Sequence, residues 1–254
     1  EFDIFEFART RAATHLWTED WVGDGASMQW AYYASVMRSA AASASDSSGP
    51  RVEFGGYVVP RAASDWPPAS WGQRRMSGGV LRKAMTLISN GAKALQYFAF
   101  GPEYQFAGNC WSDRPYTADI MRDIRRANVI IARAEPLLWP GRMPAASVAI
   151  LAPRSSYAFE NTTRAPMASN MTQQIADYSS ETYGWFLALA VHSGIPVDFL
   201  SEDDLMSKAR LAPYKVLVIT QPNVPEEAMR AALVWASKGG TLVTTSGAAR
   251  FDRY

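Results

Sequence analysis

The strongest constraint on this chain is a regular alternation of strand-like and helix-like segments. Short runs rich in β-formers lie at residues 14–21, 52–59 and 94–100, and segments of helical composition follow them at residues 29–42, 79–89 and 117–138. The third helix has the clearest pattern, because apolar residues recur at i+3 and i+4 from Ile120 to Leu138. Pro136 and Pro140 are expected to end it. This alternation is typical of βα units around a parallel sheet.

A second series of such units begins after residues 139–146 (WPGRMPAA), which we interpret as a linker. Strands are expected at residues 148–152, 197–200, 216–220 and 241–245, with helices at 179–193 and from Pro225 to Gly239. The run VAILA is continuously apolar, as expected of a strand buried on both faces. We therefore predict one domain over residues 1–138 and a second α/β domain over residues 147–254, whose completeness at the C-terminus is left open.

Composition excludes several classes of protein. The chain has 25 basic and 24 acidic residues, and this balance favours neither nucleic acid nor an anionic membrane surface as a partner. Its single cysteine allows no intrachain disulfide or cysteine-based zinc site, and it has two histidines. No apolar run approaches the roughly 20 residues of a membrane span. We expect no metal and no cofactor.

The first three units are too few for a closed barrel, which needs roughly 250 residues and eight strands. The chain also begins without Met, in EFDIFEFAR, which reads as the interior of a domain. We therefore expect a fragment with its N-terminal part missing, and we infer no cellular compartment.

The order of these segments resembles the family 42 β-galactosidase-type glycoside hydrolases. The resemblance lies in SNGAKALQYFAFGPEY at residues 89–104 and in VAILAP, GIPVDFLSEDDL, YKVLVI and WASKGGTLVTTSGAAR further on. It implies that residues 1–138 form the C-terminal portion of a (β/α)8 TIM barrel. It also implies that the second domain is flavodoxin-like, related in fold to class I glutamine amidotransferases, and serves assembly of a homotrimer.

The resemblance further implies a retaining mechanism with two carboxylates. In the family the acid/base Glu comes from the fourth barrel strand, which this chain lacks, and the nucleophile comes from the end of the seventh. Here that strand is VEFGGYVVPR, which ends in Tyr57, Pro60 and Arg61 without a Glu. Glu53 lies at its start, the wrong end of a barrel for chemistry. The family's nucleophile therefore does not carry over to this chain.

Glu19 and Glu103 are the candidate catalytic residues. Each follows a predicted barrel strand at its carboxyl end, where barrel active sites lie. Glycoside hydrolysis needs two carboxyl groups roughly 5–9.5 Å apart, and these two acids are a possible pair. The alternative is that both are ordinary acids of solvated loops. The isolated chain is expected to be inactive even if its parent is an enzyme.

Six residues are candidates for binding a carbohydrate substrate: Asp20, Trp21, Arg61, Trp66, Trp71 and Trp111. Tryptophan rings cover the apolar faces of pyranose rings, and charged side chains hold hydroxyl groups. The alternative for each tryptophan is packing of its loop, and for Arg61 an ion pair with Asp65. Trp17 and Trp30 are expected in the core, and His15 inside the domain.

Two functional hypotheses follow. One is a glycoside hydrolase acting on β-galactosides or related glycosides, and the other is a non-catalytic carbohydrate-binding or assembly protein with the same fold. The second domain offers no catalytic group, because it lacks the cysteine of an amidotransferase and a GxGxxG loop. Cys110 also lacks a plausible histidine partner and is expected to be inert.

Overall fold

A computed structural model describes residues 3–17, 27–44, 51–58, 79–98, 117–152, 154–156, 158 and 177–252. The chain forms two compact units. The first, the three-stranded unit, comprises residues 13–41 and 49–143, and the second, the four-stranded unit, comprises residues 1–12, 42–48 and 144–254. The domain boundaries expected at residues 138 and 147 stay a prediction.

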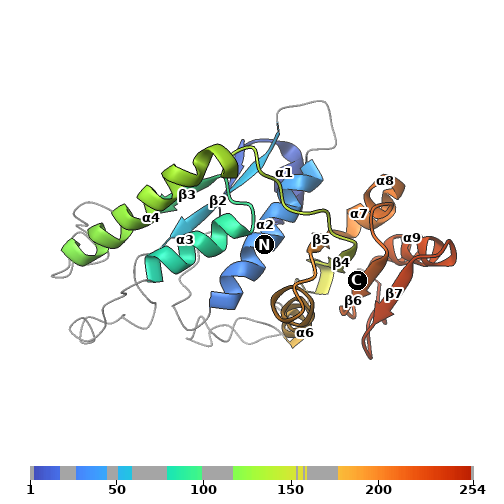
Figure 1. Ribbon diagram of the computed structural model, residues 1–254. Coiled ribbons are helices and arrows are strands. Elements are labelled where there is room, and N and C mark those ends of the chain that lie inside the picture. Colours follow the sequence, from blue (N-terminus) through green and yellow to red (C-terminus); the bar gives the residue numbers. More distant parts are fainter. Residues whose placement is uncertain are drawn as a thin grey trace. The chain divides into compact units, whose positions relative to one another are not determined.

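The three-stranded unit contains a parallel sheet in the order β1-β2-β3, of which β2 and β3 are labelled in Figure 1. Its strands are β1 (His15–Leu16), β2 (Glu53–Val58) and β3 (Ala94–Tyr97), and its helices are α2 (Ser27–Ala44), α3 (Gly79–Ser89) and α4 (Thr117–Leu138). Each strand is followed by a helix, as the sequence predicts. The parallel α/β class is therefore confirmed for this part of the chain.

The helices of this unit end for local reasons. Gly91 takes a positive φ of 97° after α3, and Ala92 N donates to Leu87 O at 3.0 Å, so the predicted Asn-Gly stop is confirmed. The helix predicted over residues 117–138 is confirmed as α4; it continues through Pro136 and ends at Leu138, before Pro140. A proline in the last turn removes only its own donor, and Trp139 N still reaches Glu135 O at 2.8 Å.

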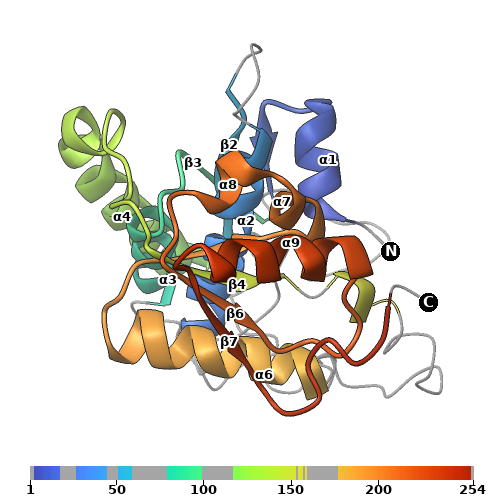
Figure 2. The same ribbon diagram turned by 90° about the vertical axis from the view of Figure 1, so that its right-hand side faces the viewer.

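The four-stranded unit contains a second parallel sheet, in the order β5-β4-β6-β7. Its strands are β4 (Val148–Leu151), β5 (Val197–Leu200), β6 (Val216–Ile219) and β7 (Thr241–Thr244). Its helices are α1 (Ile4–Thr10), α6 (Asp177–Phe186) with a π-helical continuation (Leu187–His192), α7 (Glu202–Met206), α8 (Lys208–Leu211) and α9 (Glu226–Ser237). Figure 2 shows α6 on one side of this sheet, and α7 and α9 on the other.

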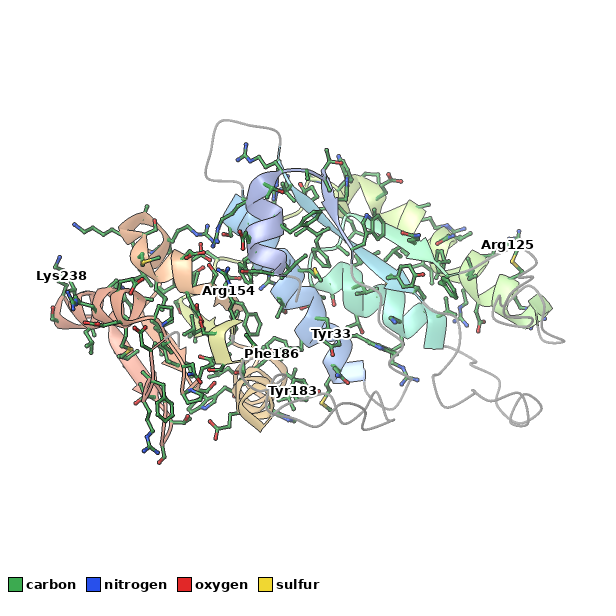
Figure 3. The ribbon with its side chains drawn as sticks, turned by 180° about the vertical axis from the view of Figure 1, so that it is seen from behind. Tyr33, Arg125, Arg154, Tyr183, Phe186 and Lys238 are labelled. Atoms are coloured by element: carbon green, nitrogen blue, oxygen red, sulfur yellow. The ribbon has the colours of Figure 1, made fainter. Side chains whose placement is uncertain are left out.

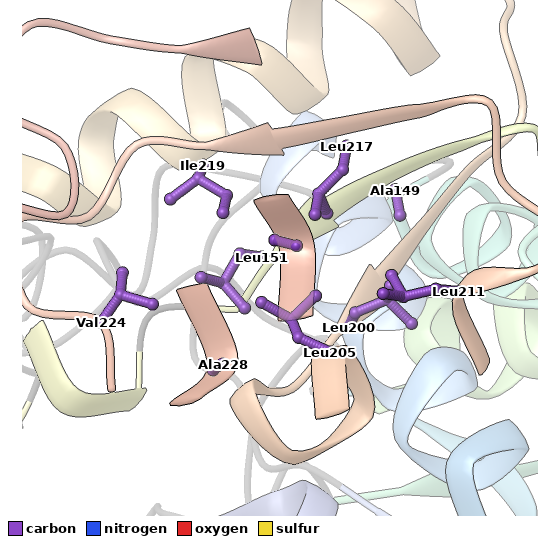
Figure 4. Close-up of a cluster of buried hydrophobic side chains, with 10 residues drawn as sticks. Ala149, Leu151, Leu200, Leu205, Leu211, Leu217, Ile219, Val224 and Ala228 are labelled. Carbon is purple, nitrogen blue, oxygen red and sulfur yellow. The ribbon is translucent and has the colours of Figure 1, made fainter. Parts of the chain in front are cut away.

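An apolar cluster fills the space between this sheet and α7 and α9 (Figure 4). It consists of Ala149, Leu151, Leu200, Leu205, Leu211, Leu217, Ile219, Val224, Ala228 and Ala232. On the opposite face the rings of Phe186 and Phe199 lie 5.9 Å apart between α6 and β5. All four residues of β4 are buried, so the prediction of a strand covered on both faces is confirmed.

Three short helices of this unit, α1, α7 and α8, were not predicted, although the caps of α1 and α7 are visible in the sequence. Ser201 caps α7 by accepting from Asp204 N, and the Asp204 side chain accepts in return from Ser201 N, which makes a capping box. Asp3 caps α1 by accepting from Phe5 N and Glu6 N. Both helices are too short to show an apolar period, so the cap was the available signal.

Arginine–carboxylate contacts hold α1 against α7 within the four-stranded unit. Arg9 pairs with Asp203 at 3.0 Å and with the nearly buried Asp204 at 3.2 Å. Arg154, labelled in Figure 3, pairs with Asp3 at 2.9 Å and with Glu6 at 3.1 Å. Residues near the start of the sequence thereby complete a unit built mainly from its second half. Among the described helices, none has the length and apolar composition needed to cross a bilayer.

Candidate functional site

The carboxyl ends of β1, β2 and β3 lie at one edge of the three-stranded sheet. The strands are parallel, and their registers pair Leu16 with Phe54 and Val58 with Tyr97. Beyond the last of these pairs, Phe98 N donates to Val58 O at 3.0 Å. The segments that follow the three strands therefore leave the sheet at the same edge, which is where parallel α/β sheets carry their ligand sites.

One face of this sheet is covered by helices. A Cβ added at Gly56 would approach Leu87 of α3 at 2.5 Å and Leu95 of β3 at 2.9 Å, so these side chains share that face. Tyr97 points to the same side, because its hydroxyl donates to Asn128 Oδ1 of α4 at 2.7 Å. Burial raises the pKa of the Tyr97 phenol above its ordinary value of 10.0. This face is therefore a packed interior.

The opposite face, which we call the open face, carries the alternate residues of each strand. It begins with His15 and Glu53, which are in register, and continues with Gly55 and Ala94. Its next pair is Tyr57 and Gln96.

Side chains on the open face are less buried than those on the helix face. Phe54 and Val58 on the helix face are buried, whereas Glu53 and Tyr57 are partly exposed and Gln96 is exposed. The open face is therefore the accessible face of this sheet in the chain.

Trp17, directly after β1, lies flat on the open face. A Cβ added at Gly55 would be 2.7 to 2.8 Å from three consecutive atoms of the six-membered ring, Cε3, Cζ3 and Cη2. A point equally distant from three consecutive ring atoms lies on the axis of the ring, so the indole faces Gly55 with its flat side. Only glycine leaves room for this arrangement. Trp17 is partly exposed, whereas the other predicted core tryptophan, Trp30, is 1% exposed.

Beyond Trp17 the open face becomes aromatic and polar. The rings of Tyr57 and Phe98 lie 5.9 Å apart with planes tilted by 39°. The ring of His15 lies 6.4 Å from that of Trp17, and its Nδ1 is 3.2 Å from Thr14 Oγ1. His15 was predicted to lie inside the domain, but its side chain is partly exposed.

All eight predicted site residues lie outside the described residues: Glu19, Asp20, Trp21, Arg61, Trp66, Trp71, Glu103 and Trp111. They belong to the three segments that follow β1, β2 and β3. Their assignment as catalytic or binding residues stays a prediction. The open-face residues beside the same strand ends, Trp17, Tyr57 and Gln96, were not predicted as site residues.

Glu53 is the one glutamate within the three strands, and it lies at the amino end of β2. Its carboxylate pairs with Arg51 Nε at 2.9 Å. This position and partner agree with the exclusion of Glu53 from the chemistry. Among the described residues, no group of three or more histidine, cysteine, aspartate or glutamate side chains is arranged to hold a metal ion.

In the four-stranded unit a buried polar layer lies at the carboxyl ends of β4 and β6. Gln221 Nε2 donates to Leu151 O at 2.6 Å and to Thr182 Oγ1 at 3.2 Å. The hydroxyls of Thr182 and Thr220 are 2.9 Å apart.

A second buried contact lies near this layer, where Glu202 accepts from Ser155 N at 2.9 Å and from Ser155 Oγ at 2.8 Å. Within the part of the chain described here, these contacts tie strand ends to helices. They present no activated nucleophile.

The fold by itself defines the structural class of this protein. Two parallel sheets with covering helices make this an α/β protein, and no protein-family model and no curated protein sequence matches it. Solved structures do match it. Gan42B, a GH42 β-galactosidase from G. stearothermophilus, and a catalytic mutant of it are each similar with a TM-score of 0.69 and 18% identity, over 99% of this chain and 35% of theirs.

Two further structures extend the comparison. A β-galactosidase from Rahnella sp. R3 gives a TM-score of 0.62 at 18% identity, over 96% of this chain and 34% of its own. A GH42 exo-carrageenase from Bacteroides ovatus gives 0.56 at 12% identity, over 89% and 28%. The predicted resemblance is confirmed at the level of the fold, and this chain spans 35% of the length of the first two structures.

Proposed function

We propose that this chain is the C-terminal part of a (β/α)8 barrel joined to a flavodoxin-like domain, in a protein that hydrolyses O-glycosidic bonds of β-galactosides or related glycosides. The substrate class comes from the structures of similar fold, which are β-galactosidases and an exo-carrageenase. Glu19 and Glu103 are the proposed carboxylate pair. Asp20, Trp21, Arg61, Trp66, Trp71 and Trp111 are the proposed sugar-binding residues.

The observation that carries this proposal is the parallel order β1-β2-β3. Glu19 follows β1 by three residues, and Glu103 follows β3 by six. Neighbouring strands lie about 4.8 Å apart, so β1 and β3 are about 10 Å apart across the sheet. Glu19 and Glu103 belong to the segments that continue from these two strands at the same edge, which supports them as a pair for glycoside hydrolysis, where two carboxyl groups about 5–9.5 Å apart are required.

The middle strand, β2, is the remaining strand of this sheet that could supply an acid. β2 ends in Tyr57 and Val58 and has no acid at its carboxyl end. Its one acid, Glu53, is at the opposite end and is paired with Arg51. β2 itself therefore supplies no acid for a dyad at this edge of the sheet.

The strand order of the four-stranded unit supports the flavodoxin-like part of the proposal. Numbered along the chain, the order β5-β4-β6-β7 is 2-1-3-4, which matches the first four strands of the flavodoxin-type sheet. The resemblance to the family 42 glycoside hydrolases implies that this unit serves assembly, with a homotrimer as the expected state. Sedimentation of the natural protein tests the trimer, and a monomer over the micromolar range contradicts it.

Hydrolysis of a panel of nitrophenyl glycosides by the natural protein at its full length tests the enzyme. Turnover of the β-galactoside is expected, and Glu19→Gln and Glu103→Gln are each expected to lower kcat by at least about 100-fold, the scale of a lost general acid or base. Full activity in both variants removes the two acids from the mechanism.

The alternative is a non-catalytic carbohydrate-binding or assembly protein, which is favoured by the absence of an acid at the carboxyl end of β2. Sugar binding without turnover of any glycoside in the panel selects this alternative over the hydrolase.

A further inference from the structure

Gln96 stands out among the strand residues of the three-stranded unit. It lies in the middle of β3, between Leu95 and Tyr97, and its side chain is exposed. Strands of parallel sheets are normally covered on both faces and are apolar throughout, as β4 is here. In the proposed barrel the open face points inward, where side chains fill the interior and ligands bind at the carboxyl ends of the strands. Gln96 lies on this face one residue before the end of β3, so its amide points to a ligand.

The register places Tyr57 directly beside Gln96. The two residues are partners across β2 and β3, and both lie on the open face, because Gly55 two residues earlier carries the Trp17 indole on that face. Partner side chains on one face of a sheet are close enough to act on one small molecule. Two hydrogen-bonding groups, an amide and a phenol, are thereby presented side by side near the carboxyl ends of the strands.

Neighbouring aromatic rings fix the position of this pair. The Tyr57 ring contacts Phe98 at 5.9 Å between centroids, and Trp17 lies on Gly55, which is the residue before Tyr57 on the same face. Tyr57 therefore lies among the aromatic rings of Phe98 and Trp17 on the open face.

We propose that Tyr57 and Gln96 together bind adjacent hydroxyl groups of a sugar ring, with the Gln96 amide donating to one hydroxyl and accepting from the next. This assignment rests on the proposed function, and it adds two specificity-determining residues to the site. An amide offers two donors and one acceptor oxygen, and a phenol both donates and accepts. This combination matches vicinal hydroxyls and fits neither a purely apolar ligand nor an anion, which would call for a cation.

Trp17 is a positioning residue in this proposal. Its indole covers the backbone of β2 at Gly55, the residue before Tyr57 on the same face, and in this proposal it occupies the space toward which the Tyr57 side chain would otherwise turn. Replacing the indole with a smaller ring is expected to loosen the Tyr57 side chain without removing a hydrogen bond to the sugar.

Calorimetric titration of the full-length protein with galactose, glucose and mannose tests the pair, with kcat and KM measured alongside on nitrophenyl β-galactoside. Gln96→Ala is expected to weaken the affinity for the preferred sugar by about 10-fold or more, because it leaves hydroxyls unpaired in the site. Tyr57→Phe is expected to weaken it by about 3- to 10-fold. Trp17→Phe should raise KM with little change in kcat.

Tyr97→Phe is the matched control, because it removes a tyrosine hydroxyl from the helix face of the neighbouring strand. It should lower stability and leave sugar affinity unchanged. Unchanged affinity in both Gln96→Ala and Tyr57→Phe overturns the proposal, and so does a wild-type protein that binds none of the three sugars. Weakened binding in a protein without hydrolytic activity upholds the sugar pair and refutes the hydrolase. Hydrolysis that is unaffected in both variants refutes the sugar pair and upholds the hydrolase.

Discussion

The two sheets of this chain are built from similar strands but differ in what lies on their faces. In the four-stranded sheet, β4 is buried throughout, with α7 and α9 on one side and α6 on the other. In the three-stranded sheet, the helix face is packed by Leu87 and Asn128, whereas the open face carries the exposed Gln96. Within this chain, helices cover both faces of the four-stranded sheet, whereas they cover one face of the three-stranded sheet.

This difference indicates which residues of the chain are candidates for a functional role. A covered sheet tolerates only apolar side chains, since a buried polar group without a partner costs about 1–3 kcal/mol. An open face tolerates amides, phenols and carboxylates because they remain accessible. The polar residues of the open face are therefore informative, whereas the apolar residues of the covered sheet report packing. Substitutions in the two sheets should have opposite consequences for stability and binding.

The largest effect on stability is expected from Leu217→Ala in the covered sheet. Leu217 is fully buried in the cluster of Figure 4, and its truncation leaves a cavity. The free energy of unfolding should fall by about 2–5 kcal/mol, measured by urea denaturation. Gln96→Ala on the open face is the comparison and should cost less than about 0.5 kcal/mol. Similar losses in both variants would mean that the open face is packed as tightly as the covered one.

A smaller effect is expected from Gly55→Ala, which forces a methyl group into the Trp17 ring at 2.7 Å. Overpacking of this kind costs about 1–3 kcal/mol and should shift the tryptophan emission. In the double variant with Trp17→Ala the methyl group meets no ring, so the cost of Gly55→Ala should largely disappear.

Gly184→Ala is the matched control for this substitution. A Cβ there meets nothing within 4 Å, and Gly184 lies inside α6. The change should stabilise the protein by about 0.5–1 kcal/mol. Equal effects of the two glycine substitutions would contradict the flat packing of Trp17 on Gly55.

Arg9→Ala tests the ion pairs that hold α1 on the four-stranded unit. Its loss removes one of the two arginines paired with the nearly buried Asp204, the other being Arg210 at 3.3 Å. A cost of about 1–3 kcal/mol is expected, with earlier proteolysis of the N-terminal segment. Arg230→Ala breaks an exposed pair with Glu226 one helical turn away and should cost less than about 0.5 kcal/mol. Resistance of α1 to proteolysis in Arg9→Ala would show that apolar contacts hold it instead.

The smallest effect is expected from alkaline pH. Burial, and next the Asp198 carboxylate 3.1 Å from its hydroxyl, raise the pKa of Tyr214 above its ordinary value of 10.0. The folded state therefore keeps this proton while the unfolded state loses it, so the stabilisation is complete below pH 10 and declines above it.

Urea midpoints measured between pH 8 and 11 test this decline. Tyr214→Phe should abolish the part of the decline that this tyrosine causes, and Asp198→Asn should reduce it, because the folded-state pKa of Tyr214 then lies closer to its unfolded value. Burial lowers the pKa of Lys93, which acts in the opposite direction, so each variant is compared with the wild type at the same pH. A slope that is the same in all three proteins would contradict the role of Tyr214.

Much of the fold could be predicted because its signals are local. The apolar run at residues 148–152, the periodic helix ending at Leu138 and the Asn-Gly stop after α3 each depend on a few neighbouring residues. The short helices α1 and α7 were missed because seven and five residues are too few for a periodic pattern. α4 has the predicted bounds and passes through Pro136, because a proline in the last helical turn costs little.

The candidate site was predictable only in part. Residues that follow strands could be chosen by chemistry, as Glu19 and Glu103 were. Gln96 and Tyr57 could not, because nothing local distinguishes the open face of a strand from its packed face. The signal that was available is the amide in the middle of ALQY, a polar residue in a strand that should be apolar.

The sequence by itself determined the alternation of strands and helices, the parallel α/β class, and the apolar character of β4. Tertiary structure alone decided that Trp17 lies on Gly55, that Tyr57 pairs with Gln96, and that Arg9 meets Asp203, 194 residues further along the chain. The reason is physical. Propensity and periodicity act within a few residues, whereas register, face and long-range ion pairing arise only when distant segments pack together.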